Sequence, residues 1–193
     1  MTKKRTEAKR SSSDFISEQI KDALLLLLKK KNYMTISVTD ICREAGISRG
    51  TFYARFNHIR EVIDLLFDDA LSLVGNFPLQ HLCKPLDTSN DGLPLCIFLR
   101  QNKKYQPLFF SDLLYVSAVE HTVASLRDGF LSVMKEQCDL DEEMMEDLLY
   151  YQITGCMAVC KKYINRSDDE WERRRCNVDL FLKTGFSKMK DIT

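Results

Sequence analysis

Apolar residues recur at steps of three and four along most of this chain, the spacing that gathers side chains on one face of an α-helix. The first such stripe, which includes Ile20, Leu24 and Leu27, predicts a helix over residues 14–31. We find no convincing run with the alternation of apolar and polar residues that marks a half-buried strand. The pattern therefore predicts an all-α protein.

The helical spacing is interrupted between residues 76 and 92, where Pro, Asp, Ser, Asn and Gly residues indicate a connection. Beyond the first helix and the segment discussed next, helices are predicted over residues 59–73, 93–104, 108–110, 112–137, 141–165 and 168–190. In the last of these, Val178, Phe181 and Leu182 belong to the stripe that should face the core. With two short helices between residues 37 and 56, about nine helices are expected.

Residues 37–56 predict two short helices joined by a tight turn. Ser37 can cap the first helix, because its hydroxyl can accept from an unpaired amide while Asp40, three residues later, reaches back. Gly46 stands where a helix ends in a left-handed residue, a conformation that glycine adopts without steric cost. Ser48 can then cap the second helix.

The second short helix has an inward and an outward side. Phe52 and Phe56, four residues apart, should face inward. Arg49, Gly50 and Tyr53 then lie on a short basic surface that carries an aromatic ring. This is the layout of a helix-turn-helix, whose second helix enters the DNA major groove.

The segment resembles the DNA-binding domain of the TetR family of bacterial transcriptional regulators. The family pattern is roughly T-V-x-D-I-A, followed by A-G-V-S-x-G-T-x-Y-x-x-F. Nearly every fixed position is met by Ser37-Val-Thr-Asp-Ile-Cys and by Ala45-Gly-Ile-Ser-Arg-Gly-Thr-Phe-Tyr-Ala-Arg-Phe56. The resemblance covers about a third of the chain, from about Phe15 to Ala70, and the remainder is similar to the family in length and helical content.

The resemblance implies which residues meet DNA. An arginine suits bidentate contact with a guanine edge, so Arg49, together with Tyr53, should set the sequence preference. Contacts to phosphates set the register on the duplex. The expected DNA-binding residues are Ser37, Thr39, Ser48, Arg49, Gly50, Thr51, Tyr53, Arg55, His58 and Arg60.

One position departs from the family pattern. The family usually has a lysine at the start of the fourth helix, where it binds a phosphate, and here that residue is Ile59. His58 or Arg60 could bind the phosphate instead, or the amides at the helix N-terminus could hold it.

The distribution of charge agrees with a DNA-binding N-terminal part. The net charge is zero, but residues 1–60 contain 13 Lys or Arg against 6 Asp or Glu, and residues 61–193 contain 15 against 22. A basic end on an acidic body suits a protein that meets a polyanion through one end. Residues 1–13 read as a disordered basic arm that either orders on the duplex or serves as a solubility tail.

The second part of the chain should bind an effector and form a dimer, as the resemblance implies. Several aromatic residues either line an effector pocket or fill the core: Phe98, Tyr105, Phe109, Phe110, Tyr115 and Trp171. The last two helices are apolar on two faces, and a second copy of the chain offers the simplest cover for the outer face. The dimer residues expected there are Tyr151, Gly155, Ala158, Leu180 and Gly185.

The remaining candidate chemistry is sparse. His58, His81 and His121 lie far apart and in no catalytic or metal signature, so we expect neither an enzyme nor a bound cofactor or metal. Seven cysteines without framework spacing indicate free thiols in a reducing cytoplasm. Cys156 and Cys160 share one helix face and could sense redox state or bind a metal, but core filling is the favoured interpretation.

The sequence thus predicts a cytoplasmic transcriptional regulator with two domains. A three-helix helix-turn-helix domain should cover residues 1–75 and a helical effector-binding and dimerisation domain residues 76–193. The longest purely apolar run, residues 24–28, is far too short to span a membrane. A homodimer on a palindromic operator, released by a small-molecule effector as a repressor, is the first interpretation. The alternative is a regulator or activator whose helical body is controlled by a partner protein.

Overall fold

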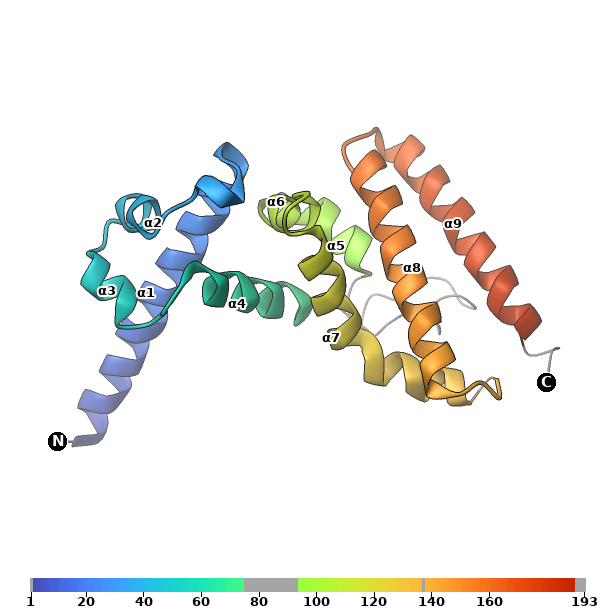
Figure 1. The fold of residues 1–193 in the computed structure, drawn as a ribbon, viewed down its shortest axis with the longest axis horizontal. Coiled ribbons are helices and arrows are strands. Elements are labelled where there is room, and N and C mark those ends of the chain that lie inside the picture. The colour runs from blue at the N-terminus through green and yellow to red at the C-terminus, as the bar shows by residue number, and fades with distance from the viewer. Residues whose placement is uncertain (1, 75–93, 137, 190–193) are drawn as a thin grey trace.

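The computed structural model describes residues 2–74, 94–136 and 138–189, with side chains from residue 14 onward except those of 183, 186, 187 and 189. These parts of the chain fold into nine α-helices and two short 3₁₀ helices (Figure 1), which confirms the all-α expectation. The predicted connection over residues 76–92, with His81, lies outside the described residues. The helices are α1 (Thr2–Lys30), η1 (Tyr33–Thr35), α2 (Val38–Ala45), α3 (Arg49–Tyr53), α4 (Ile59–Leu71), α5 (Leu95–Gln101), η2 (Lys103–Tyr105), α6 (Gln106–Phe110), α7 (Tyr115–Lys135), α8 (Glu142–Tyr163) and α9 (Asp168–Met189).

The first helix is longer than the apolar spacing predicts. It begins at Thr2, so the expectation of a disordered arm before residue 14 is wrong. The arm contains no Gly or Pro, and Glu7, Ala8, Lys9 and Arg10 are strong helix formers. The helix propensity of these residues therefore explains why the helix includes a segment that has no apolar stripe.

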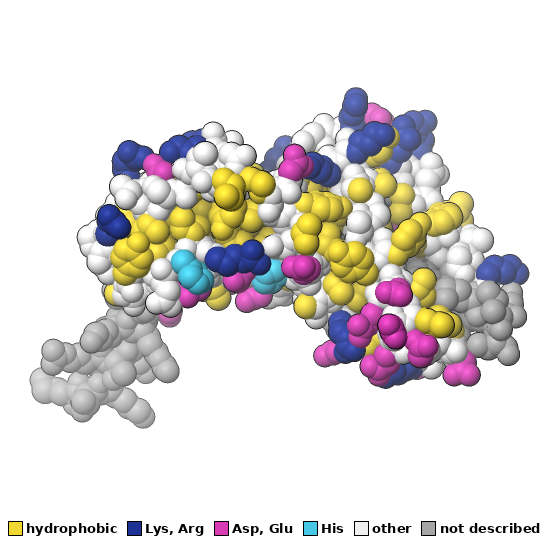
Figure 2. All heavy atoms as spheres, viewed as in Figure 1, with side chains coloured by type: hydrophobic (Ala, Val, Ile, Leu, Met, Phe, Trp, Pro, Cys, Tyr) yellow, Lys and Arg dark blue, Asp and Glu magenta, His cyan; other side chains and the backbone are white. Residues whose placement is uncertain are grey.

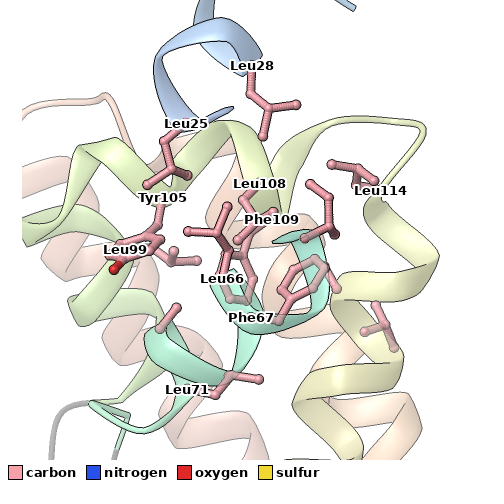
Figure 3. Packing of buried hydrophobic residues seen from close by; sticks show 14 of the residues in the cluster. Leu25, Leu28, Leu66, Phe67, Leu71, Leu99, Tyr105, Leu108, Phe109 and Leu114 are labelled. Atoms are coloured by element: carbon pink, nitrogen blue, oxygen red, sulfur yellow. The ribbon is translucent and has the colours of Figure 1, made fainter. Parts of the chain in front are cut away.

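Helix α4 joins the N-terminal helices to the rest of the molecule. It packs against α1 on one side and α7 on the other (Figure 1). The ring of Phe67 contacts Phe109 of α6 edge-on, with centroids 5.2 Å apart, and stacks on His121 of α7 at 4.7 Å. Figure 3 shows side chains of α1, α4, α5, η2 and α6 meeting in the same apolar region.

The C-terminal half is built on α7, α8 and α9. Helix α8 packs against α7, and α9 lies beside α8 on the side away from α7 (Figure 1). Arg100 of α5 fixes the turn between α8 and α9, because its guanidinium donates to the carbonyls of Ile164 and Arg166. The same guanidinium lies 5.2 Å from the ring centre of Trp171. The start of α9 is therefore anchored to α5.

Candidate DNA-binding site

The N-terminus of α2 carries the predicted capping box. The amide of Asp40 donates to Ser37 Oγ at 3.1 Å, and the amide of Ser37 donates to Asp40 Oδ2 at 3.1 Å. The hydrogen bond from the Ser37 amide, with a further one from Lys31 Nζ, lowers the pKa of Asp40 to about 2. The carboxylate therefore stays charged at the positive end of the helix, where a negative charge is favourable.

The turn between α2 and α3 has the geometry that glycine at position 46 predicts. Gly46 has φ 66° and ψ 32°, in the left-handed region, and the Ile47 amide donates to the Cys42 carbonyl at 2.9 Å. A Cβ at residue 46 would meet nothing within 4 Å. The need for glycine here is therefore conformational and not a matter of space. Ser48 then caps α3 by accepting from the Thr51 amide at 3.0 Å.

Helix α3 buries one side and exposes the other. Phe52 is fully buried and Phe56 nearly so, and their ring centroids are 5.8 Å apart. This anchoring leaves Arg49 and Gly50 exposed, with the Tyr53 side chain 48% exposed. The Arg49 guanidinium lies 5.9 Å from the Tyr53 ring centre. A cation and an aromatic ring therefore share the outer surface of α3.

Most of the other predicted DNA-binding residues lie around this surface. Ser37, Thr39 and Ser48 are exposed at the ends and outer side of the two short helices. Thr51 is half-buried, and its hydroxyl lies 2.9 Å from that of Ser48. Arg55 is also half-buried, and its Nε has no hydrogen-bond partner. The Nε–H of Arg55 therefore donates no hydrogen bond within the folded domain.

The start of α4 shows what replaces the family lysine. Ile59 is half-buried and packs on the core, so its side chain offers nothing to a phosphate. His58 caps α4 by accepting from the Glu61 amide at 3.3 Å, and its ring stays exposed. Arg60 donates to Asp64 at 2.9 Å and is also exposed. Nε2 of His58 lies 3.8 Å from Glu61 Oε1, so each of the two candidates already faces a carboxylate of α4.

Acidic side chains gather at one place on the face that Figure 2 shows, around the turn between α7 and α8. Lys and Arg side chains gather at two places on this face, at the end that carries α2 and α3 and where α8 meets α9. Lys30, Lys31, Arg43 and Arg49 are exposed near the two short helices. Among the described side chains, these four cations therefore lie on the same end as α3.

Residues 20–65 match the model of the bacterial regulatory proteins of the tetR family. These residues form a TetR-family helix-turn-helix domain. The match spans most of α1, all of α2 and α3, and the first half of α4. The chain is accordingly a DNA-binding transcriptional regulator. A comparison with curated proteins finds no match to the chain.

The residues predicted for the second part of this TetR-like chain are dispersed. Phe98, Tyr105 and Phe109 are buried in the core, with Phe98 and Tyr105 5.6 Å apart between ring centroids. Tyr115 is half-buried and donates to the Thr154 carbonyl at 3.1 Å. Phe110 is half-buried at a separate surface hollow, and Trp171 lies under Arg100. The structure does not gather these six aromatic residues around one cavity.

A cavity does lie elsewhere in the second part of the chain, among α5, α7, α8 and α9. Its volume is about 100 Å³, and Val74, Leu126, Gln152 and Asp179 are among its lining residues. The apolar spacing of the sequence does not predict this cavity, although one signal is present. Gln152 interrupts the apolar stripe of α8 between Leu149 and Ile153, and a polar residue in a buried stripe marks a possible site.

The residues expected at a dimer interface are exposed, and two of them, Tyr151 and Gly155, line a groove between α8 and α9. Tyr151, Gly155, Ala158, Leu180 and Gly185 are all exposed. A groove of about 680 Å³ runs between α8 and α9, and Tyr151 and Phe181 line it. A Cβ at Gly155 or Gly185 would meet nothing within 4 Å. Among the residues that the structure describes, nothing covers this face of α8 and α9.

Two negative findings concern the described part of the chain alone. Among these residues no cluster of three His, Cys, Asp or Glu side chains could hold a metal ion. In the same residues, no helix combines the length and apolarity that crossing a bilayer requires.

Proposed function

We propose that the chain reads a palindromic DNA operator through α3 of two copies and that its helical body controls this binding in response to an effector. The observation that carries the proposal is the exposed pair Arg49 and Tyr53 on a capped recognition helix. Arg49 is placed to donate to a guanine edge, and Tyr53 to contact a base or the backbone. Ser37, Thr51 and Arg55 are assigned to phosphates, which set the register.

The proposed dimer is supported by the uncovered face of α8 and α9. Tyr151 and Phe181, each 68% exposed, line the groove between α8 and α9 together with the exposed Tyr150. Contiguous apolar surface of this kind marks an interaction site. A second copy related by a two-fold axis would cover both helices at once and form a four-helix bundle. Such a dimer would hold its two α3 helices about 34–36 Å apart, one turn of the duplex.

Effector control is supported by the position of the cavity. Val74, three residues beyond the end of α4, lines the cavity, and α4 begins next to the recognition helix. A ligand that favours one arrangement of the body would shift α4 and change DNA affinity. We propose repression relieved by such a ligand in the cytoplasm. The alternative, control by a partner protein, would use the exposed apolar face and would leave the cavity empty.

Selection of random duplexes on the pure protein tests the DNA-binding proposal. The expected product is a palindrome with half-site centres about 10–10.5 base pairs apart. Affinity for this duplex should fall steeply with salt, because bound Lys and Arg release counterions. Arg166→Ala, an exposed arginine between α8 and α9, provides a control of equal charge for Arg49→Ala. A flat salt response, or enrichment of no sequence, would refute the proposal.

A further inference from the structure

The carboxylate of Asp64 in α4 links the DNA-binding end of the molecule to the helical body. Arg60 Nε, one turn closer to α3, donates to Asp64 Oδ1 at 2.9 Å. His121 of α7 places its ring Nε2 3.3 Å from the same oxygen. One carboxylate oxygen therefore contacts both a candidate for DNA contact and a residue of the body.

The ring of His121 faces two carboxylates and an aromatic ring. Its Nδ1 lies 4.0 Å from Asp68 Oδ1, and the ring stacks on that of Phe67 at 4.7 Å between centroids. A neutral imidazole carries one N–H, whereas the protonated ring carries a positive charge and an N–H on each nitrogen. The side chain is 25% exposed, so a proton from water can reach it. Protonation therefore changes how strongly His121 attracts the carboxylates of Asp64 and Asp68.

The charges on the other helices that pack against α7 lie away from this ring. Helix α7 packs on α4, α6 and α8, and α6 has no ionisable residue. The carboxylates of α8 that pair with α7 contact Arg127 and Lys135, further along the helix. Glu120 precedes His121, but successive residues of a helix do not face each other. Among the described residues, the two aspartates of α4 are the carboxylates within 4.0 Å of the His121 ring nitrogens.

We propose that His121 is a positioning residue for DNA binding, which competes with Arg60 for Asp64 and thereby sets whether the Arg60 guanidinium is available to a phosphate. The inference rests on the proposed function, since it assigns Arg60 to the phosphate that the family lysine would bind. A neutral His121 leaves Asp64 to Arg60. A protonated His121 holds the carboxylate on α7, releases Arg60 and offsets a negative charge that repels the phosphate. Operator affinity should therefore rise as the pH falls.

The first test measures the dissociation constant of the duplex enriched by selection, at about pH 8 and about pH 6 and at constant ionic strength. Histidine ordinarily changes its charge in this range. A partly exposed ion pair changes an equilibrium constant by up to about fivefold. The gain at low pH should therefore be about threefold per subunit and about tenfold for a dimer. His121→Gln, which keeps a hydrogen-bond donor but carries no charge, should lose this gain. His58→Gln is the matched control and should retain the part of the gain that His121→Gln removes.

Arg60→Ala separates positioning from a merely structural effect of His121. In the Arg60→Ala background, His121→Gln should no longer alter the pH response, because the two residues act through the same carboxylate. A His121-dependent response that survives without Arg60 overturns the proposal. A low-pH gain that is unchanged in His121→Gln overturns it as well.

Arginine side-chain NMR of the free protein tests the competition without DNA. The Nε–H signal of Arg60 should shift between about pH 8 and about pH 6 in the wild type and stay in place in His121→Gln. An Arg60 signal that does not move in the wild type refutes the competition for Asp64, even if the protein selects a duplex as proposed. A shifting signal in a protein that enriches no duplex would instead overturn the proposed function, and with it the role of Arg60 at a phosphate.

Discussion

Replacing Phe181 by Glu tests the proposed dimer most directly. An aromatic side chain buries about 150–250 Å². At 68% exposure, Phe181 therefore leaves about 130 Å² to be covered in each copy. At about 25 cal/mol per Å², covering this area contributes about 3 kcal/mol per copy, and about 6 kcal/mol in a two-fold dimer. Even half of this contribution corresponds to a roughly hundredfold change in the dissociation constant.

Sedimentation velocity at micromolar concentration measures the outcome. The wild type should sediment as a dimer of the 22.4 kDa chain and Phe181→Glu as a folded monomer, since the side chain is exposed in the single chain. Met34→Glu is the matched control, because Met34 is an exposed apolar residue of η1 and belongs to neither α8 nor α9. A wild-type monomer, or a Phe181→Glu dimer of unchanged affinity, would refute the reasoning and remove the basis for a palindromic operator.

Four further predictions concern single residues. Arg49→Ala should cost about 1–3 kcal/mol of operator binding and relax base preference at one position per half-site, and equal weakening of all duplexes would reassign Arg49 to a phosphate. Gly46→Ala should lower the free energy of unfolding by about 1 kcal/mol through strain at φ 66°, measured by urea denaturation, and an unchanged midpoint would contradict this. Because the pKa of Asp40 is lowered from 3.8 to about 2, its contribution to stability is fully present above about pH 4 and is lost as the pH falls through about 2. Asp40→Asn should therefore flatten the acid limb of the unfolding curve. Mild oxidant should leave DNA binding unchanged, since the raised pKa of Cys156 keeps its thiol unreactive, and a reversible loss abolished by Cys156→Ser would establish a thiol switch.

Local hydrogen bonding explains which parts of the fold and the site the sequence could predict. The caps at Ser37 and Ser48 and the left-handed Gly46 each depend on residues within four positions, and the structure has all three. The outward position of Arg49 and Tyr53 could be predicted because helical periodicity alone places the neighbouring Phe52 on the buried side. These features are properties of a short segment and need no knowledge of the rest of the chain.

Long-range packing explains what the sequence could not predict. Phe181 lies on an apolar stripe of α9, but α9 is apolar on more than one side, and periodicity does not tell which side meets the molecule's own core. The structure exposes Phe181 and buries Trp171 under Arg100, a residue 71 positions earlier in the chain. Contacts between distant elements likewise place Phe109 against Phe67 of α4 and Tyr115 against Thr154 of α8, and no local pattern reveals them. Gln152 was the one visible sign of the cavity.

The shared packing of α4 limits how far the two domains are separable. A boundary at residue 75 divides the chain by sequence motif, yet Leu66, Phe67 and Leu71 of α4 are buried among side chains from beyond that boundary (Figure 3). A fragment ending at residue 75 would carry these side chains into water, with their partners removed. The DNA-binding end is therefore not a detachable module. Another helical body fused to it would have to supply a complementary apolar surface for α4. Exchange of such domains between regulators is constrained at this helix and not at the helix-turn-helix itself.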